Sequence, residues 1–180
     1  MRKRDRERGA TLVEASLIMP IMLLVMIGTL ELGLVFKDYL TVSYASREGA
    51  RVGALAGNAA DADCAIVQSV VDILGPASLG DFQKLQIYAA DPSTGNRIVA
   101  KTNSWTLVGS DPYDCANDWT IVENWPSTSR EVLFGSSSTL DIIGVRIIST
   151  HDYITGLPPF AGSIDIDEAT ISRMEPEGFD

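Results

Sequence analysis

Few residues in this chain could do catalytic chemistry, and they are poorly placed for it. The single histidine, His151, adjoins Asp152 near the end of a predicted strand, and no serine lies in a G-x-S-x-G context. Asp165 and Asp167 alternate along one strand and so share a face, but alternating acids on an outer strand face are usually just solvated. The sequence contains no glycine-rich phosphate loop. We therefore expect a protein that is not an enzyme and uses no cofactor.

The two cysteines, Cys64 and Cys115, point to structure rather than to catalysis. Both follow a long apolar segment, in a part expected to be exported, where oxidation is permitted, so we expect them to form a disulfide. A pair of buried free thiols is the alternative. Two cysteines and one histidine at wide spacing do not make a zinc site. Three aspartates near Cys115 (Asp111, Asp114 and Asp118) could hold calcium, but their spacing is not that of an EF-hand, and we expect no metal site.

The apolar segment, residues 10–36 (ATLVEASLIMPIMLLVMIGTLELGLVF), contains only two charges, Glu14 and Glu31. As a helix with a rise of about 1.5 Å per residue it would be roughly 40 Å long, enough to cross a hydrocarbon core of about 30 Å. The sequence therefore predicts one membrane span. Glu31 lies one to two turns from the far end, where it either pairs inside an assembly or reaches the interface.

The leader that precedes the span, MRKRDRERG, carries five Lys or Arg against two acids. A basic cluster beside a first span stays cytoplasmic, so we expect a single-pass protein of the cytoplasmic (inner) membrane with its N-terminus inside and its C-terminal domain outside. A cleaved secretory signal is the alternative. Its apolar region usually spans about 7–15 residues, however, whereas this one continues into a second helical pattern.

The junction between leader and span places Glu14 five residues after Gly9. This G-x-x-x-x-E pattern resembles the processing site of prepilins, in which a membrane peptidase cuts after the glycine and the glutamate takes part in fibre assembly. More closely, RGATLVEASLIMPIMLL and the later ASREGAR at 45–51 resemble the TadE family of the tight-adherence (Flp) pilus system. Members of that family have a short basic leader and one span with an early proline. The resemblance covers roughly the first 55 residues, and more loosely ISRMEP at 171–176.

This resemblance implies cleavage between Gly9 and Ala10, an assembly role for Glu14, and a structural protein without chemistry of its own. It also implies three kinds of partner: a prepilin peptidase, other pilins, and the platform protein of pilus assembly. The first hypothesis is thus a minor pilin or pseudopilin that helps to assemble or prime an adhesive pilus. The second is a permanently anchored extracytoplasmic binding domain that is neither cleaved nor polymerised, and the mature N-terminus distinguishes the two.

Three parts are expected: the leader at 1–9, the transmembrane helix with its extracytoplasmic extension at 10–57, and an extracytoplasmic α+β domain at 58–180. In the extension Ala45, Gly49, Gly53 and Gly57 recur every four residues and share one helix face. An interior glycine costs about 1 kcal/mol relative to alanine, so we expect this face to pack closely against another element. The chain's own sheet is the favoured partner, and a neighbouring helix is the alternative.

The α+β domain should begin where Gly57 and Asn58 end the long helix. A second helix is expected at 62–74, and strands are expected at 84–90, 97–102, 105–108, 119–123, 140–148 and 163–174. Residues 140–148 are apolar on both faces, as in an interior strand. We therefore predict a pilin-like α+β fold, in which a long N-terminal transmembrane helix leads into a small antiparallel-sheet head with a second helix.

Charge narrows the range of partners. The formal net charge is −10, and loss of the leader, with its five positive and two negative charges, would change it to −13. Nucleic acids and anionic lipid headgroups bind basic patches. The sequence therefore argues against nucleic acid as a partner, and leaves the membrane bilayer and other proteins.

Overall fold

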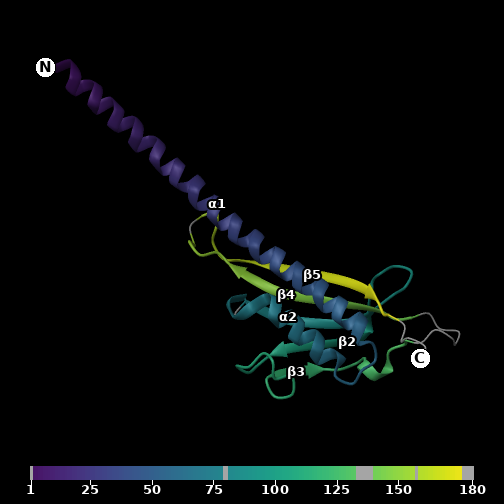
Figure 1. Ribbon diagram of the computed structural model, residues 1–180. Coiled ribbons are helices and arrows are strands. Elements are labelled where there is room, and N and C mark those ends of the chain that lie inside the picture. The colour runs from purple at the N-terminus through teal and green to yellow at the C-terminus, as the bar shows by residue number, and fades with distance from the viewer. Residues whose placement is uncertain (1, 79–80, 133–139, 157, 176–180) are drawn as a thin grey trace. The chain divides into compact units, whose positions relative to one another are not determined.

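The structure is a computed structural model that describes residues 2–78, 81–132, 140–156 and 158–175. Within these residues a long helix comes first, followed by a second helix and a small antiparallel sheet, which confirms the predicted α+β class (Figure 1). The elements in chain order are α1 (Arg2–Ala56), α2 (Ala62–Ser78), β1 (Phe82–Ala90), β2 (Arg97–Leu107), β3 (Trp119–Val122), the 3-10 helix η1 (Ser127–Ser129), β4 (Ile142–Asp152) and β5 (Ser163–Arg173).

The chain divides into two compact units. One consists of α1 up to Lys37 together with Tyr153–Ser163, and the other of Asp38–Asp152 and the chain from Ile164 onward. The first unit contains the apolar segment, and we call the second the head. The unit boundary falls inside α1, so a single helix contributes to both units.

The long helix α1 owes its apolar half to a run of Leu, Ile, Val and Met, and it continues through Pro20. It ends where the sequence predicts. Gly57 has φ +57°, and its N–H donates to the carbonyl of Gly53 at 3.2 Å. This positive φ suits glycine, which has no Cβ to clash. α2 is interrupted at Gly75, which has φ +65°, and this agrees with the predicted end of the second helix.

The sheet has the strand order β3-β2-β1-β4-β5. β1 pairs with β4 from Phe82 opposite Ser149 to Ala90 opposite Ile142, and β1 pairs with β2 on its other side. β4 thus lies between β1 and β5, as its apolar sequence predicts. The predicted strands at 97–102 and 105–108 prove to be one strand, β2, because Asn103 and Ser104 continue the pairing opposite Ile87 and Gln86.

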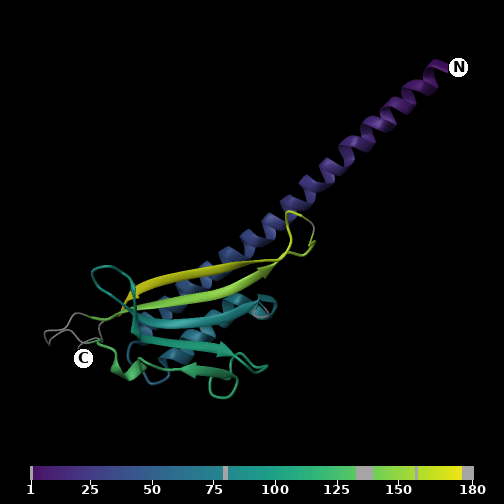
Figure 2. The ribbon, with the colours of Figure 1, turned by 180° about the vertical axis from the view of Figure 1, so that it is seen from behind.

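The head has two layers. α2 and the C-terminal part of α1 lie on one face of the sheet. Figure 1 views the head from the side of these helices, and Figure 2 views it from the side of the strands. The core fills the space between the layers with buried aliphatic side chains from both helices and from the central strands, among them Val42, Ile66, Val70, Ile87, Ile143 and Val145. Three tryptophans, Trp105, Trp119 and Trp125, extend the core toward β3.

Candidate membrane-anchoring and assembly site

The predicted processing junction lies inside α1. The backbone of Gly9 and Ala10 is helical, like the rest of the leader from Arg2 onward. One turn further along, Glu14 is exposed on the helix surface. Four residues of helix separate Ala10 from Glu14, a rise of about 6 Å. The structure therefore places Gly9 and Ala10 in one turn, and Glu14 about one turn later, at one end of the apolar segment.

Glu14 lies among exposed apolar side chains. Leu12, Val13, Leu17 and Ile18 all expose more than half of their surface, and their exposure continues along the apolar segment. A charged residue at mid-span costs about 2.5–3.5 kcal/mol on insertion scales, and less near a membrane boundary. Glu14 is near the beginning of the segment, where a single helix can tolerate the charge.

Among the described residues, one helix is long and apolar enough to cross a membrane. It covers Thr11–Ala56, with a mean hydropathy of 2.2 in its most apolar window, and only 11% of that window is buried. An apolar helix with so little of its surface covered by its own chain is unlike the core helix of a soluble protein. This supports membrane anchoring through α1.

Glu31, the second carboxylate of the segment, has a different environment. Its side chain accepts hydrogen bonds from the backbone N–H groups of Thr155 at 2.6 Å and Ile154 at 3.3 Å, and only 1% of the residue is exposed. The sequence left open an assembly pairing or an interfacial position, and the structure shows that Glu31 has hydrogen-bond partners within its own chain. The lack of charged residues in 153–163 is the one signal that could have indicated such a loop.

The close-packing face of α1 lies inside the head. A Cβ built at Gly49 would be 2.9 Å from Val70 Cγ2 and 3.2 Å from Val145 Cγ1, and one at Gly53 would be 2.7 Å from Ile143 Cδ1. Both positions therefore lack room for a side chain. Ala45 is fully buried, and a Cβ at Gly57 would be 3.3 Å from Val132. The chain's own sheet and its own α2 together cover this face. No helix from another chain is needed to fill it.

The disulfide and the acidic loop belong to the head. Cys64 in α2 is bonded to Cys115 in the loop between β2 and β3, with a Cα–Cα distance of 5.8 Å. The nearby aspartates hold the loop itself: Asp114 accepts from the N–H groups of Ala116 and Asn117, both at 3.1 Å, and the Asp118 carboxylate accepts from the N–H of Asp111. These contacts form hydrogen-bonded turns of the backbone in this loop.

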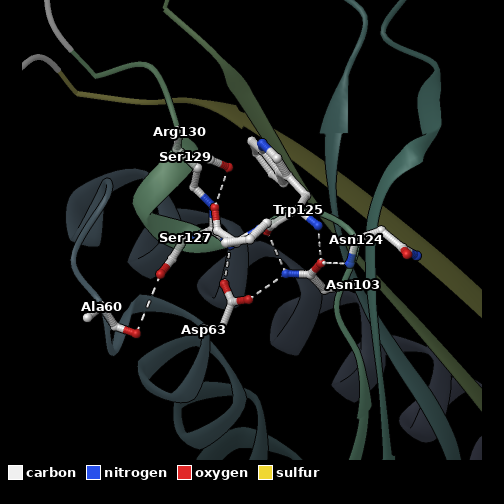
Figure 3. Close-up of polar contacts among 9 residues, drawn as sticks. Ala60, Asp63, Asn103, Asn124, Trp125, Ser127, Ser129 and Arg130 are labelled. Atoms are coloured by element: carbon white, nitrogen blue, oxygen red, sulfur yellow. Dashed lines mark hydrogen bonds and ion pairs between the residues drawn. The ribbon is translucent and has the colours of Figure 1, made fainter.

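A buried polar network, which the sequence does not reveal, holds α2 to the chain that follows β3 (Figure 3). Arg130 is ion-paired with Asp63, and its guanidinium stacks over the Trp125 ring at 4.7 Å. Asn103 bridges the two sides: its amide donates to Asp63 at 2.7 Å and to the Trp125 carbonyl at 2.8 Å. Its oxygen accepts from the N–H groups of Asn124 and Trp125. Buried polar groups need partners, and the network supplies them to the Asp63 carboxylate and the Asn103 amide.

His151 and Asp38 form another buried pair. Nδ1 of His151 lies 2.6 Å from Oδ2 of Asp38, which links β4 to α1 within the head. Asp152 next to it is exposed. On the same sheet, Asp167 is paired with Arg146 and Asp165 accepts from Thr150 at 3.2 Å, so the two acids have different partners. Ser149, which lines the same small pocket as His151, donates its hydroxyl hydrogen to the Asp81 carbonyl at 3.0 Å.

The comparisons with known proteins give one finding. Residues 9–51 match the model of a protein family described as TadE-like protein, whereas no curated protein and no solved structure matches. The match begins at Gly9, includes Glu14 and, on the close-packing face, Ala45 and Gly49, and ends at Arg51, before Gly53. The looser resemblance at 171–176 lies outside it. Over residues 9–51, which cover the apolar segment and part of the extension that enters the head, the chain is thus similar to TadE-like proteins.

Proposed function

We propose that this chain is a minor pilin or pseudopilin of a Tad/Flp-type adhesive pilus, processed by a prepilin peptidase after Gly9. The observation that carries the proposal is the family match, because it begins at the glycine itself and leaves the basic leader outside. The exposed apolar helix behind that glycine supports it, since a prepilin-like subunit needs a span that can later pack against other subunits.

In this proposal the leader stays in the cytoplasm and the head lies outside the inner membrane. Cleavage exposes the amine of Ala10, one helical turn from the Glu14 carboxylate. In a bundle of spans that amine meets the Glu14 of a neighbour. Two unit charges about 4 Å apart attract by roughly 4 kcal/mol at an effective dielectric of 20, before desolvation is subtracted. Such pairing offsets the cost of inserting Glu14 and favours one axial register.

The partners follow from this sequence of steps. A prepilin peptidase acts on the Gly9–Ala10 bond, other pilins receive the span, and the assembly platform in the membrane handles the processed subunit. The head is structural in this proposal: its buried polar groups serve packing, and the chain's formal net charge of −10 does not favour nucleic acid as a partner.

The first experiment is intact-mass measurement of the protein from cells that contain the cognate peptidase. The expected mass lacks residues 1–9, and a Gly9→Val variant is expected to keep them because a branched side chain fits poorly where the peptidase accepts glycine. An uncut chain, or cleavage elsewhere, would contradict the proposal. It would favour the alternative of a permanently anchored extracytoplasmic binding domain.

A second experiment tests the assembly step. Glu14→Gln keeps the shape of the side chain and removes its charge, so the variant should be cleaved, inserted and disulfide-bonded but absent from purified pili or from the assembly complex. Glu123→Gln is the matched control, because Glu123 is an exposed acid of the head, and it should incorporate as the parent does. If Glu14→Gln incorporates equally well, Glu14 is only a tolerated boundary carboxylate.

A further inference from the structure

The loop Tyr153–Ser163 joins two strands of the head yet belongs to the same compact unit as the apolar segment of α1. We call it the β4–β5 loop. Its sequence, YITGLPPFAGS, contains no charged residue, although 21% of the whole chain is charged. Connections between strands normally face water and are polar. An uncharged apolar connection beside a membrane helix therefore needs another explanation.

The first attachment of this loop is polar. The N–H groups of Ile154 and Thr155 donate to the Glu31 carboxylate. A carboxylate that accepts backbone hydrogen bonds is far less costly in an apolar setting than a bare one, and backbone N–H groups in lipid must likewise be satisfied inside the protein. The contact thus lets both the carboxylate of the helix and the backbone of the loop leave water together.

The second attachment is apolar and lies one turn earlier on the same side of the helix. A Cβ built at Gly28 would be 3.0 Å from Cε2 of Phe160, so the ring lies directly against the helix backbone. Phe160 also meets Tyr153 edge to face, with 5.7 Å between ring centroids. Tyr153 in turn donates its N–H to the Gly162 carbonyl at 3.1 Å, which closes the loop. Tyrosine is enriched at membrane–water interfaces.

The height of these contacts along α1 fits the edge of a membrane. If the hydrocarbon core begins near Thr11, a rise of about 1.5 Å per residue puts Gly28 roughly 26 Å and Glu31 roughly 30 Å into it. A core of about 30 Å then ends at the level of Glu31. The β4–β5 loop therefore meets the helix within the outermost part of the core and the adjoining interface.

Between helix and loop there is an apolar groove of about 430 Å³, lined by Ile27, Leu30, Glu31 and Leu34 of α1 and by Ile154 and Thr155 of the loop. Ile154, one of the lining residues, is 74% exposed, which is high for an isoleucine. The groove continues the exposed apolar surface of the span. At this height that surface faces hydrocarbon, and acyl chains are the matching occupant.

We propose that the β4–β5 loop is a second membrane-contacting element, which lies in the interfacial layer of the leaflet on the head's side and packs lipid acyl chains against Ile154 and the groove beside Glu31. The loop shields Glu31 from lipid while its own apolar side chains gain a hydrocarbon contact. The proposal depends on insertion of α1 but not on cleavage after Gly9.

The test uses the full chain in phosphatidylcholine vesicles, with an environment-sensitive fluorophore on a single added cysteine, under non-reducing conditions that preserve the Cys64–Cys115 bond. Ile154→Cys reports on the loop. Val99→Cys is the matched control, because Val99 is an aliphatic residue of β2 in the head with a similar exposure of 71%. Leu23→Cys, exposed at the middle of the span, reports insertion of α1. Lipids with a spin label near the headgroup or deep in the chain act as quenchers, and iodide probes water.

The expected result is a blue-shifted label at residue 154 that loses intensity with the shallow spin label and resists iodide, whereas the label at residue 99 shows the reverse. A label at 154 that iodide quenches as strongly as the one at 99 would place the loop in water and overturn the proposal. A blue-shifted label that no lipid quenches would also overturn it, because a protein such as a second copy of this chain would then cover the groove.

The label at residue 23 separates this proposal from the proposed function. If the deep spin label quenches residue 23 but residue 154 behaves as in water, only the loop proposal is wrong. If residue 23 is not quenched either, α1 is not inserted, and the loop proposal and the membrane anchoring of the proposed pilin both fail. Cleavage after Gly9 is measured independently by mass.

Discussion

Glu14 and Glu31 have different environments in one apolar helix. Glu14 is exposed among apolar side chains, whereas the Glu31 carboxylate accepts two backbone N–H groups of its own chain. A carboxylate whose hydrogen bonds are satisfied within the chain has little to gain from an external cation. Of the two, Glu14 is therefore the residue suited to pair with a neighbouring subunit, and Glu31 is suited to hold the β4–β5 loop.

The buried pair of Asp63 and Arg130 gives a prediction about stability. Arg130 is 3% exposed and Asp63 is nearly as buried, so Arg130→Leu leaves an uncompensated carboxylate and should cost about 3–5 kcal/mol of unfolding free energy. Urea unfolding of the full chain in detergent, followed by tryptophan fluorescence, measures this loss in the head, where all three tryptophans lie.

The matched variant for that experiment is the double substitution Asp63→Asn with Arg130→Leu. It removes both charges, so it should lose less stability than Arg130→Leu alone. A double variant that is destabilised by the sum of the two single effects would mean that the two charges are not coupled.

A second residue-scale prediction concerns Asp91, in the turn between β1 and β2. The hydroxyl of Ser93 and the N–H groups of Thr94 and Ser93 donate to its carboxylate and lower its pKa from 3.8 to about 2. Because the pKa is lower in the folded chain, the carboxylate stabilises the turn fully above pH 3.8, and this contribution is lost as the pH falls toward 2. Carboxyl chemical shifts measured by NMR should show a midpoint near pH 2.

The Ser93 hydroxyl is the largest cause of that shift. Ser93→Ala should therefore move the Asp91 midpoint up toward 3.8, while Ser129→Ala, at an exposed hydroxyl in η1, should leave it unchanged. An Asp91 midpoint that does not respond to Ser93→Ala would contradict the hydrogen-bond explanation.

At the scale of elements, the packing of α1 in the head depends on missing side chains. Gly53→Val should cost about 1–3 kcal/mol, because its methyl groups would overlap Ile143 and Ile66. Leu55→Val is the control: it places the same β-branched residue on the exposed side of the same helix, where the loss should be only a few tenths of a kcal/mol. Equal denaturant midpoints for the two variants would show that the close contact at Gly53 is not needed.

The sequence predicts those elements best whose signals are local. The end of α1 at Gly57 depends on backbone conformation alone, and the apolar pattern of β4 identifies it as an interior strand. The sequence predicts the ends of an element less accurately where contacts with residues distant in the sequence determine them. β4 continues to Asp152, beyond the expected end at 148, because the N–H of Thr150 donates to the Asp81 carbonyl at 2.8 Å and His151 meets Asp38.

The same limit applies to the candidate site. The spacing of Gly9 and Ala10 in one turn and Glu14 about one turn later follows from helical periodicity, so the sequence alone predicts it. The partner of Glu31 lies 123 residues away, and no local pattern connects the two. Asn103 is a similar case. The sequence predicts that it lies in a polar break between two strands, but it is fully buried because Asp63 and Trp125 supply its hydrogen bonds.

At the scale of the whole molecule, one covalent link ties α2 to the loop before β3. Cys64 and Cys115 are 51 residues apart in the sequence, and closing a loop of that length stabilises the folded head by about 4 kcal/mol on the chain-entropy model. The variant Cys64→Ser with Cys115→Ser should therefore unfold at a clearly lower urea concentration. Thiol labelling of the parent without reductant should modify neither cysteine.

The control for this prediction is the reduced parent, which should unfold at the same urea concentration as the double serine variant. A parent that labels at both positions, or a double variant as stable as the oxidised parent, would mean that packing alone holds the two segments together.

The position of β5 near the end of the sequence means that α1 is synthesised well before the strand that contacts it. Ser46 of α1 hydrogen-bonds Thr170 of β5, and the Ala54 carbonyl accepts from the N–H of Glu175. Ser46 and Thr170 are 124 residues apart, so at about 5–20 residues per second the ribosome needs roughly 6–25 s to supply that partner after α1 has been made. β4, which covers Gly49 and Gly53, is also made late. Each newly made chain thus has an interval in which the Gly49 and Gly53 face of α1 is not yet covered by the chain's own sheet, and during that interval a helix of another protein can compete for this face.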